Sequence, residues 1–354
     1  MDMVTRIDQE RREHELLAPW AAFSDASAGR ATPVDEDPLR TCYQRDRDKI
    51  LHSKSFRRLA NKTQVFLAPE GDHYRTRLTH TLEVSQIARS IARPLGLNED
   101  LVEAIALGHD LGHTPFGHCG ERALAERIAR VRGIDPASDQ GKACFRHNEQ
   151  SVRIVELLEG GGQGLNLTRE VVDGMLNHTG GGKATTCEGQ VVARADRIAY
   201  VTHDIDDAER AGLLSEDTLP DEFCDVLGHG SSERITTMVE DVVRESARCG
   251  QICMSELVEE AMMGLRGYLF DNLYSKGEAK TEEPKAAQMI GSLFDYYVAH
   301  PDEIPDEYRI HGEGKPWVQA ADYVSSMTDR YAIRTFTELC VPHAWALHLQ
   351  PARR

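Results

Sequence analysis

The chain has 354 residues, which is long enough for one large domain or two smaller ones with a substantial buried core. Its 58 acidic and 41 basic residues give a formal net charge of -17 at pH 7. This balance argues against a general affinity for polyanions, because binding to a phosphate backbone relies on Lys and Arg. We therefore expect no nucleic-acid partner, and any anionic substrate must meet a locally basic pocket.

Cysteine usage and hydropathy indicate the compartment. The eight cysteines include no Cys-x-x-Cys pair, and the closest spacing, from Cys249 to Cys253, is a one-turn helical interval that suits reduced thiols. Residues 1–12 contain no apolar core of a signal peptide, and no later segment approaches the ~20 apolar residues that span a bilayer. The sequence therefore predicts a cytoplasmic protein that does not associate with membranes.

Apolar residues recur at helical spacing along most of the chain, whereas strand-like alternation is scarce. A first helix is predicted over 78–95, with an apolar face formed by Leu78, Leu82, Ile87, Ile91 and Leu95. Asn98 is placed to cap a second helix, which runs through an apolar stretch to a break at Gly112. We therefore predict an all-α fold.

Further helices are predicted downstream from the same spacing. One ends before the glycines at 160–162, and another follows Thr168 as its cap. The further helical windows are 152–158, 168–176, 191–211, 235–243 and 321–336. The stretch 274–284 is polar and charged, so we expect an exposed loop there.

One short motif indicates the chemistry. Residues 109–118 read His-Asp-Leu-Gly-His-Thr-Pro-Phe-Gly-His and follow the largely apolar stretch 101–107. Burying such groups without partners costs roughly 2–7 kcal/mol even for a neutral polar group. The cluster therefore needs a metal ion, a substrate or internal pairing, and we expect a metal-dependent hydrolase.

His109 and Asp110 need further ligands from other helices, because adjacent residues lie about 100° apart around a helix. His80 in the first predicted helix and Asp196 in a later one are the candidates. Taken alone, each is more often an ordinary hydrogen-bonded or solvated side chain. Together with the 109–118 motif they form a mixed nitrogen and oxygen set, which suits Mn, Fe, Co, Ni or Zn and, less comfortably, Mg.

Longer motifs extend well beyond the His-Asp pair. They are RTCYQRDRDKI at 40–50, FRRL at 56–59, KTQVF at 62–66, DHYRTRLTHTLEV at 72–84, AIALGHD at 104–110, HNEQS at 147–151, ADRIAY at 195–200, DY at 322–323 and MTDR at 327–330. These motifs resemble the bacterial deoxyguanosine triphosphate triphosphohydrolase family, which belongs to the HD-domain superfamily.

The resemblance implies an HD-domain helical bundle with additional C-terminal helices. On this basis we divide the chain into an N-terminal extension at 1–37, an HD-type metal-dependent phosphohydrolase core at 38–211, and a C-terminal helical region at 212–354 packed on the core. The activity implied is hydrolysis of a deoxynucleoside triphosphate to the deoxynucleoside and tripolyphosphate, by attack of water on the α-phosphorus.

The resemblance also implies roles for individual residues. The metal ligands in the family fall on His80, His109, Asp110 and Asp196, and we expect Mn²⁺ or Mg²⁺ first, with Fe, Co, Ni or Zn as alternatives. His118 matches the proposed acid, base or nucleophile, Glu121 lies within one turn to orient it, and His113 contacts the phosphate chain.

The substrate-binding residues implied by the same motifs are Arg77 and Arg197 for the phosphates, Tyr200 and Asp204 for the sugar and phosphate pocket, and His147 near the substrate. A core aromatic is the alternative interpretation of Tyr200, and a helix-capping sequence that of His147. Four residues serve either the substrate or an oligomer interface: Arg57, Arg58, Lys62 and Gln64. Asp322 and Arg330 either contact a nucleotide or belong to a charged helix surface.

The chain is shorter than the long enterobacterial type and lacks its insertions, which favours a broader range of deoxynucleotides than dGTP alone. We expect a homo-oligomer with deoxynucleoside triphosphates as substrate and as possible activator. Two alternatives stay open: an HD-type phosphohydrolase that acts on another nucleotide, and a regulator that binds nucleotides without turnover.

Overall fold

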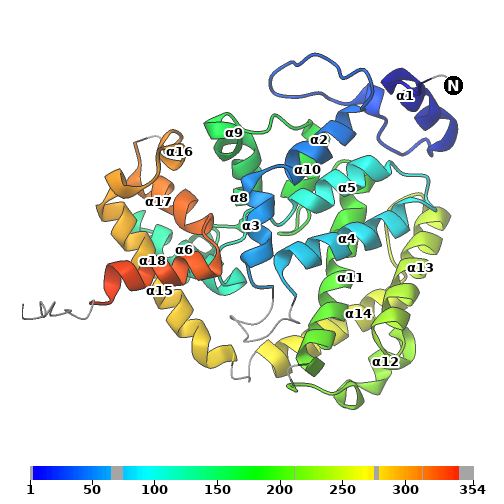
Figure 1. The fold of residues 1–354 in the computed structure, drawn as a ribbon. Coiled ribbons are helices and arrows are strands. Elements are labelled where there is room, and N and C mark those ends of the chain that lie inside the picture. Colours follow the sequence, from blue (N-terminus) through cyan, green and yellow to red (C-terminus); the bar gives the residue numbers. More distant parts are fainter. Residues whose placement is uncertain (1–2, 65–74, 211, 275–278, 313, 343–354) are drawn as a thin grey trace, which may run out of the picture.

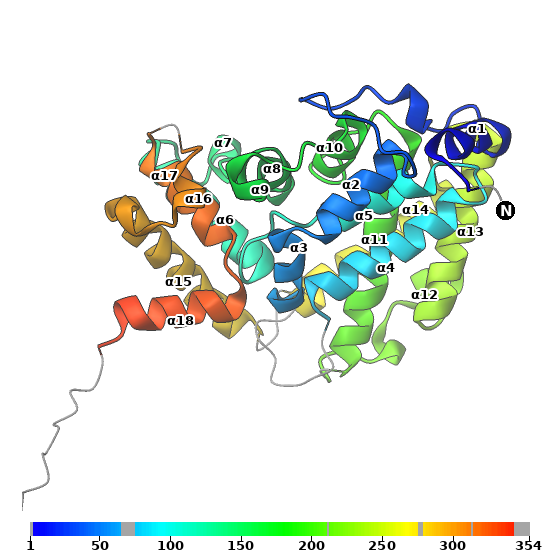
Figure 2. The same ribbon diagram turned by 45° about the horizontal axis from the view of Figure 1, so that its top comes forward.

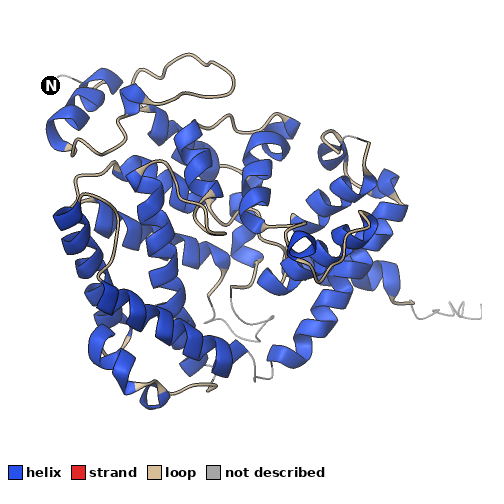
Figure 3. Cartoon of the chain, turned by 180° about the vertical axis from the view of Figure 1, so that it is seen from behind, coloured by secondary structure: helices blue, strands red, loops and turns tan. Residues whose placement is uncertain are grey.

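The structure, a computed structural model, describes residues 3–64, 75–210, 212–274, 279–312 and 314–342 (Figure 1). Within these ranges every extended regular element is a helix and no strand is present, as Figure 3 shows. The all-α fold class is therefore confirmed. Among the same residues, no helix combines the length and the apolar character that a membrane span requires.

The helices of the first part of the chain are α1 (Arg6–Leu16), α2 (Cys42–Leu51), α3 (Lys54–Arg58), α4 (Arg77–Ala92), α5 (Glu99–Gly108), α6 (Gly117–Val131), α7 (Asp139–Lys142), α8 (His147–Arg153), α9 (Glu159–Gly162), α10 (Arg169–Leu176) and α11 (Cys187–Arg210). Those that follow are α12 (Asp221–Leu227), α13 (Ser231–Cys249), α14 (Glu256–Leu269), α15 (Ala279–Ala299), α16 (Asp306–Arg309), α17 (Pro316–Ser325) and α18 (Asp329–Cys340). Two π-helical segments, Ile154–Leu158 and Phe270–Tyr274, continue α8 and α14.

Helix α5 is the centre of the fold, because it packs against α2, α4, α10 and α11. Asn98 caps it as predicted, with its side chain accepting hydrogen bonds from the backbone of Asp100 and Leu101. Its apolar residues are fully or almost fully buried, and each large one contributes about 1.5–3 kcal/mol. The helix ends at Gly108, so His109 and Asp110 begin the following turn inside the core.

Two glycines bring α5 and α10 unusually close together. A Cβ atom on Gly174 would lie 2.5 Å from Cδ1 of Ile105, and one on Gly108 would lie 2.7 Å from Sδ of Met175. Any larger residue would push the helices apart. The C-terminal ends of α5 and α10 are therefore neighbours.

The helices after α11 form two groups on different sides of the core (Figures 1 and 2). Helices α13 and α14 pack on α11, and α12 packs on α13 and α14. Helices α15 and α17 pack on α6, and α18 packs on α15. The second group thus lies beside the turn that carries the 109–118 motif.

Most predicted helices are present, with identifiable exceptions. Leu82 was placed on the apolar face of α4 but is 50% exposed, whereas Ile87 and Ile91 are buried. The predicted helical window over 321–336 is helical but forms two helices and not one, because the chain breaks between α17 and α18 and Thr328 caps the second helix. Thr168 precedes α10 as predicted, but its side chain makes no capping hydrogen bond.

Two local predictions change with the structure. The loop expected at 274–284 is wrong from Ala279 onward, because those residues belong to α15 with Pro284 inside the helix; 275–278 lie outside the described residues. Cys249 and Cys253 do not share one helix, because α13 ends at Cys249 and Gly250 adopts a left-handed conformation. Their thiols are free, with the Sγ atoms 2.9 Å apart.

Candidate metal centre and active site

The structure brings the four predicted metal ligands together from three segments. His80 lies on α4, His109 and Asp110 follow α5, and Asp196 lies on α11. Nε2 of His80 is 3.1 Å from Oδ1 of Asp196, and Nε2 of His109 is 3.4 Å from Oδ1 of Asp110 and 3.7 Å from Oδ1 of Asp196. The spacing is suitable for ligands of a single ion.

His109 is prepared as a metal ligand. Its Nδ1 atom lies 2.7 Å from the carbonyl oxygen of Ala106, which can only accept, so Nδ1 carries the proton and Nε2 has a lone pair. That Nε2 atom is buried and has no hydrogen-bond partner among the described residues. A backbone carbonyl that fixes the tautomer in this way is a frequent companion of metal-binding histidines. The residues present therefore fit a divalent metal ion.

Both carboxylates of the cluster are held in the ionised form. Burial alone would raise the pKa of Asp110, but His113, His109 and Arg77 outweigh it and keep the pKa well below its usual range. Burial is likewise outweighed at Asp196, where the hydrogen bond to His80 and the nearby His109 lower the pKa. The cluster therefore presents two negative charges, which favours a cation.

Arg77 lies inside this cluster rather than in an open phosphate pocket. The residue is 2% exposed, and its Nη1 atom donates to Oδ2 of Asp110 at 2.7 Å. Its Nε atom is buried without a partner among the described residues. Arg197 differs, because its side chain is exposed on α11 next to Asp196.

A second group of residues lies beside the metal ligands. Nδ1 of His118 is 2.8 Å from Oε2 of Glu121, and Oε1 of Glu121 is 3.0 Å from Nδ1 of His147. Burial opposes ionisation of Glu121, but the hydrogen bonds from both histidines lower its pKa far below the usual range. The carboxylate therefore orients two imidazoles at once. The side chain of His118 is 54% exposed, whereas those of the four candidate metal ligands are at most 23% exposed.

His113 connects the two groups. Its Nε2 atom lies 3.3 Å from Oδ1 of Asp110, and its ring stacks on that of His147 with centroids 3.9 Å apart. Burial, with the charge of Arg77, lowers the pKa of His113 well below its usual value. His113 is therefore a neutral imidazole at pH 7, and its Nδ1 atom has no partner among the described residues.

The turn between His113 and His118 is anchored by residues far away in sequence. The Nζ atom of the buried Lys62 donates to the carbonyl oxygens of His113 and Ser325. The backbone N–H of Phe116 donates to Oδ1 of Asp329 at 3.1 Å. Phe116 has a positive φ of 61°, which is strained for a bulky residue, so the turn depends on such anchors.

Tyr200 and Asp204 lie one and two turns beyond Asp196 on α11. Asp204 is buried and hydrogen-bonded to Tyr200, and burial together with Asp207 raises the pKa of Asp204 well above its usual value. The sequence left two interpretations of Asp322 open, a nucleotide contact and a charge on a helix surface. In the structure Asp322 is buried and pairs with Arg153 at 2.7 Å. The surface interpretation of Asp322 is therefore wrong.

Sequence reasoning missed one residue of the site, His178. It follows the C-terminal end of α10 and is buried, with its ring 4.9 Å from that of His109. Its Nδ1 atom lies 2.7 Å from the carbonyl oxygen of Met175, the same arrangement that His109 has with Ala106. The available signal was a histidine just after a buried amphipathic helix and before a run of glycines at 180–182.

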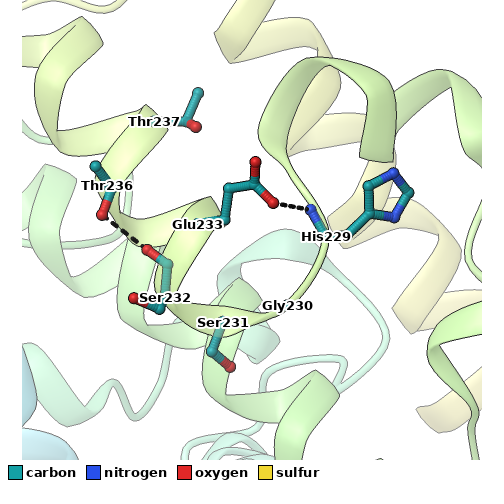
Figure 4. Close-up of a pocket in the computed structure, with 7 residues that line it drawn as sticks. All are labelled: His229, Gly230, Ser231, Ser232, Glu233, Thr236 and Thr237. Carbon is teal, nitrogen blue, oxygen red and sulfur yellow. Dashed lines mark hydrogen bonds between the residues drawn. The ribbon is translucent and has the colours of Figure 1, made fainter.

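A hollow at the start of α13 is separate from this site (Figure 4). Its lining residues are His229, Gly230, Ser231, Ser232, Glu233, Thr236 and Thr237. The carboxylate of Glu233 accepts from the backbone N–H of His229 at 2.8 Å, so a negative charge already occupies the start of the helix. The hollow contains none of the residues of the metal cluster.

Comparison with known proteins identifies the class of this site. Residues 77–201 match the HD domain, a range that contains all four candidate metal ligands, and residues 252–338 match a phosphohydrolase-associated domain. The all-helical core that contains the buried cluster of His and Asp residues is therefore an HD domain.

Curated relatives cover nearly the whole chain. A deoxyguanosinetriphosphate triphosphohydrolase-like protein of Caldanaerobacter subterraneus subsp. tengcongensis is 50% identical over 347 residues, which is 97% of this chain and 98% of that protein. Proteins of the same description from Clostridium perfringens and Desulfatibacillum aliphaticivorans are 47% and 45% identical, each over 96% of this chain and 98% and 99% of their own length.

The chain belongs to the deoxyguanosinetriphosphate triphosphohydrolase-like family, as its motifs predict, and is a metal-dependent hydrolase. Among solved structures, a hypothetical protein from Aquifex aeolicus matches with a TM-score of 0.40 and 20% identity over 83% of this chain and 70% of that chain. The family assignment does not depend on that likeness.

Proposed function

We propose that the protein hydrolyses deoxynucleoside triphosphates to the deoxynucleoside and tripolyphosphate. The observation that carries the proposal is the contact of His113 with both Asp110 and His147, which joins a buried ion site to an acid–base pair open to solvent. The names of relatives at 45–50% identity support the same substrate class. Water attacks the α-phosphorus, and the bond from that phosphorus to the 5′ oxygen breaks.

His80, His109, Asp110 and Asp196 would hold the divalent ion, with Mn²⁺ or Mg²⁺ expected first and Fe, Co, Ni or Zn as alternatives. When bound, the ion supplies Lewis-acid chemistry to an α-phosphate oxygen and to the attacking water. The buried Nε atom of Arg77 offers an unused N–H donor, which a phosphate oxygen would satisfy. His113 is also assigned to the phosphate chain: its neutral ring donates through Nε2 to Asp110, so its unpartnered Nδ1 atom would accept a hydrogen bond from a water molecule bound to the phosphates.

His118 is the proposed acid and base. Because its Nδ1 atom donates to Glu121, its Nε2 atom is left to accept a proton from water and to return it to the 5′ oxygen. His147 holds the other oxygen of Glu121, and so fixes the carboxylate that orients His118. Removal of one proton from water and protonation of one leaving oxygen balance the reaction.

The remaining substrate contacts are assigned to α11. Arg197 is exposed beside Asp196 and is available to the outer phosphates. Tyr200 and Asp204 would line the sugar, and their buried hydrogen bond makes that wall rigid. We further propose a range of bases broader than guanine, a homo-oligomeric assembly, and deoxynucleoside triphosphates as activators as well as substrates.

The test is a product analysis. Purified protein is incubated with Mn²⁺ or Mg²⁺ and with each deoxynucleoside triphosphate, singly and in mixtures, and the products are separated by chromatography. Deoxynucleoside and tripolyphosphate in equal amounts are expected. Release of single phosphates would point instead to another HD-type phosphohydrolase, and binding without turnover would point to a nucleotide-binding regulator.

A further inference from the structure

His147 and His178 meet at their Nε2 atoms inside the site. These two nitrogens lie 3.3 Å apart, and both residues are more than nine-tenths buried. Two imidazole lone pairs repel each other at that distance unless a positive species lies between them. The contact therefore needs either a proton or a cation.

The opposite nitrogen of each ring already uses the single proton of a neutral imidazole. Nδ1 of His178 faces the carbonyl oxygen of Met175 at 2.7 Å and must donate to it. Nδ1 of His147 faces a carboxylate oxygen of Glu121 at 3.0 Å and donates likewise. In their neutral forms, His147 and His178 therefore direct two lone pairs toward the same small volume.

The distances suit ligands of an ion. Donors that hold a metal at ~2.1 Å lie roughly 3.0–3.5 Å apart when they are adjacent in its coordination shell. Oδ1 of Asp110 is 4.0 Å from Nε2 of His178, so Asp110, His147 and His178 can reach one ion together. The same Oδ1 atom is 3.4 Å from Nε2 of His109, which belongs to the first site.

We propose that a second divalent cation binds between His147 and His178, with Asp110 shared between this ion and the ion of the proposed function. The proposal rests on that function only for the first ion. Three carboxylates, those of Asp110, Asp196 and Glu121, surround the volume, against one buried guanidinium, that of Arg77.

The ligands also indicate the kind of ion. Two imidazoles and one carboxylate favour Mn²⁺, Fe²⁺, Co²⁺ or Zn²⁺ over Mg²⁺, which prefers oxygen. Two ions that share a ligand lie about 3.5–4 Å apart in enzymes that transfer phosphoryl groups. A pair at this spacing can bind both the oxygen that attacks and the oxygen that leaves.

The test counts ions and does not depend on turnover. Metal-depleted protein is loaded with Mn²⁺, desalted and analysed for manganese per chain, and the loaded protein is examined by electron paramagnetic resonance. We expect two ions and an exchange-coupled signal for the unaltered protein. We expect one ion and an uncoupled signal for both His178→Ala and His147→Ala.

Matched variants control the count. His300→Ala removes an exposed histidine and should keep two ions, whereas Asp110→Ala should lose both. Far-ultraviolet circular dichroism checks that each variant is folded, and His178→Gln repeats the test if His178→Ala is not. His147 lies on α8 and His178 follows α10, so the two variants test the second ion independently.

Three other outcomes overturn the proposal. One ion in the unaltered protein would leave a proton between the two histidines, even if deoxynucleotides are hydrolysed normally. A fall from one ion to none in His178→Ala would make His178 a ligand of the first site. Two ions retained in both histidine variants would place the second ion elsewhere. Two ions without triphosphate hydrolysis would contradict the proposed function alone.

Discussion

The two halves of the site differ in how they are built. The proposed ligands for the first ion lie on α4, on α11 and in the turn that follows α5, and His80, His109 and Asp110 are almost completely buried. The proposed acid–base half lies on a turn and the start of α6, where the side chain of His118 is 54% exposed. The difference teaches how the proposed roles divide: the buried core would hold the ion, whereas the group proposed to exchange protons lies within reach of water and substrate.

The largest effect is expected when a proposed metal ligand in the buried half of the site is removed. Asp110→Ala or Asp196→Ala removes a carboxylate that is held ionised, so the ion should be lost and turnover abolished while the helices remain. Elemental analysis of the purified variants and product assays measure both effects. Asp302→Ala, at a fully exposed carboxylate, is the control. A variant that keeps full metal content would remove that aspartate from the ligand set.

The next effect separates the two halves. His118→Ala should retain metal and deoxynucleotide binding, but its turnover should fall about 10²–10⁴-fold, the usual contribution of a positioned acid or base. Glu121→Ala should cost less, and the double variant should be little worse than His118→Ala, because Glu121 acts through His118. Loss of metal from His118→Ala would show instead that His118 is itself a metal ligand.

The third prediction concerns the sugar. Tyr200 and Asp204, which are proposed to line the sugar, already share a hydrogen bond, so an added hydroxyl group at C2′ should find neither space nor a partner, and ribonucleotides should be hydrolysed at least about tenfold more slowly. The measurement is kcat/KM for GTP and dGTP under the same metal conditions. Equal values for the two nucleotides would favour the broader phosphohydrolase alternative.

The smallest effect is on stability and concerns the anchor of the turn. Burial, with the charge of Arg58, lowers the pKa of Lys62 from 10.5 to about 7. Between these two pH values the unfolded chain binds the proton more readily than the folded chain, so this residue makes stability increase as pH rises through that window. Lys62→Met cannot titrate and should lack this increment.

Urea unfolding at pH 6.5, 8 and 9.5 tests the anchor. The unfolding free energy of the unaltered protein, compared with that of Lys62→Met, should shift in favour of the unaltered protein as pH rises. Lys54→Met, at an exposed lysine, is the control and should show no such shift. Parallel pH profiles for the unaltered protein and Lys62→Met would show that Lys62 is charged in the fold.

The sequence predicted the helical class and the four ion ligands because both leave local or motif-level signals. It missed His178, because a single histidine reaches the site only through the close contact of α5 with α10 at Gly108 and Gly174. It also could not show that Arg77 already has an internal partner in Asp110. Such facts depend on tertiary packing, which periodicity does not record.

The same limit explains the error at 274–284 and the missed break within 321–336. A polar stretch can be a surface helix, as Ala279–Ala299 shows, and a continuous apolar pattern does not reveal a break capped by Thr328. The roles of Arg197, Tyr200 and Asp204 remain predictions from the family motifs.

The anchoring of the 113–118 turn has a consequence for modularity. Residues 77–201 contain every proposed ion ligand, but the turn that carries His118 is fastened to Ser325 and Asp329, more than a hundred residues outside that range. The HD segment is therefore not a portable unit. A chimaera that exchanges the C-terminal helices between relatives must keep Lys62, Asp329 and the backbone carbonyl at Ser325 in register, because otherwise the turn that carries His118 would be displaced from the ion ligands.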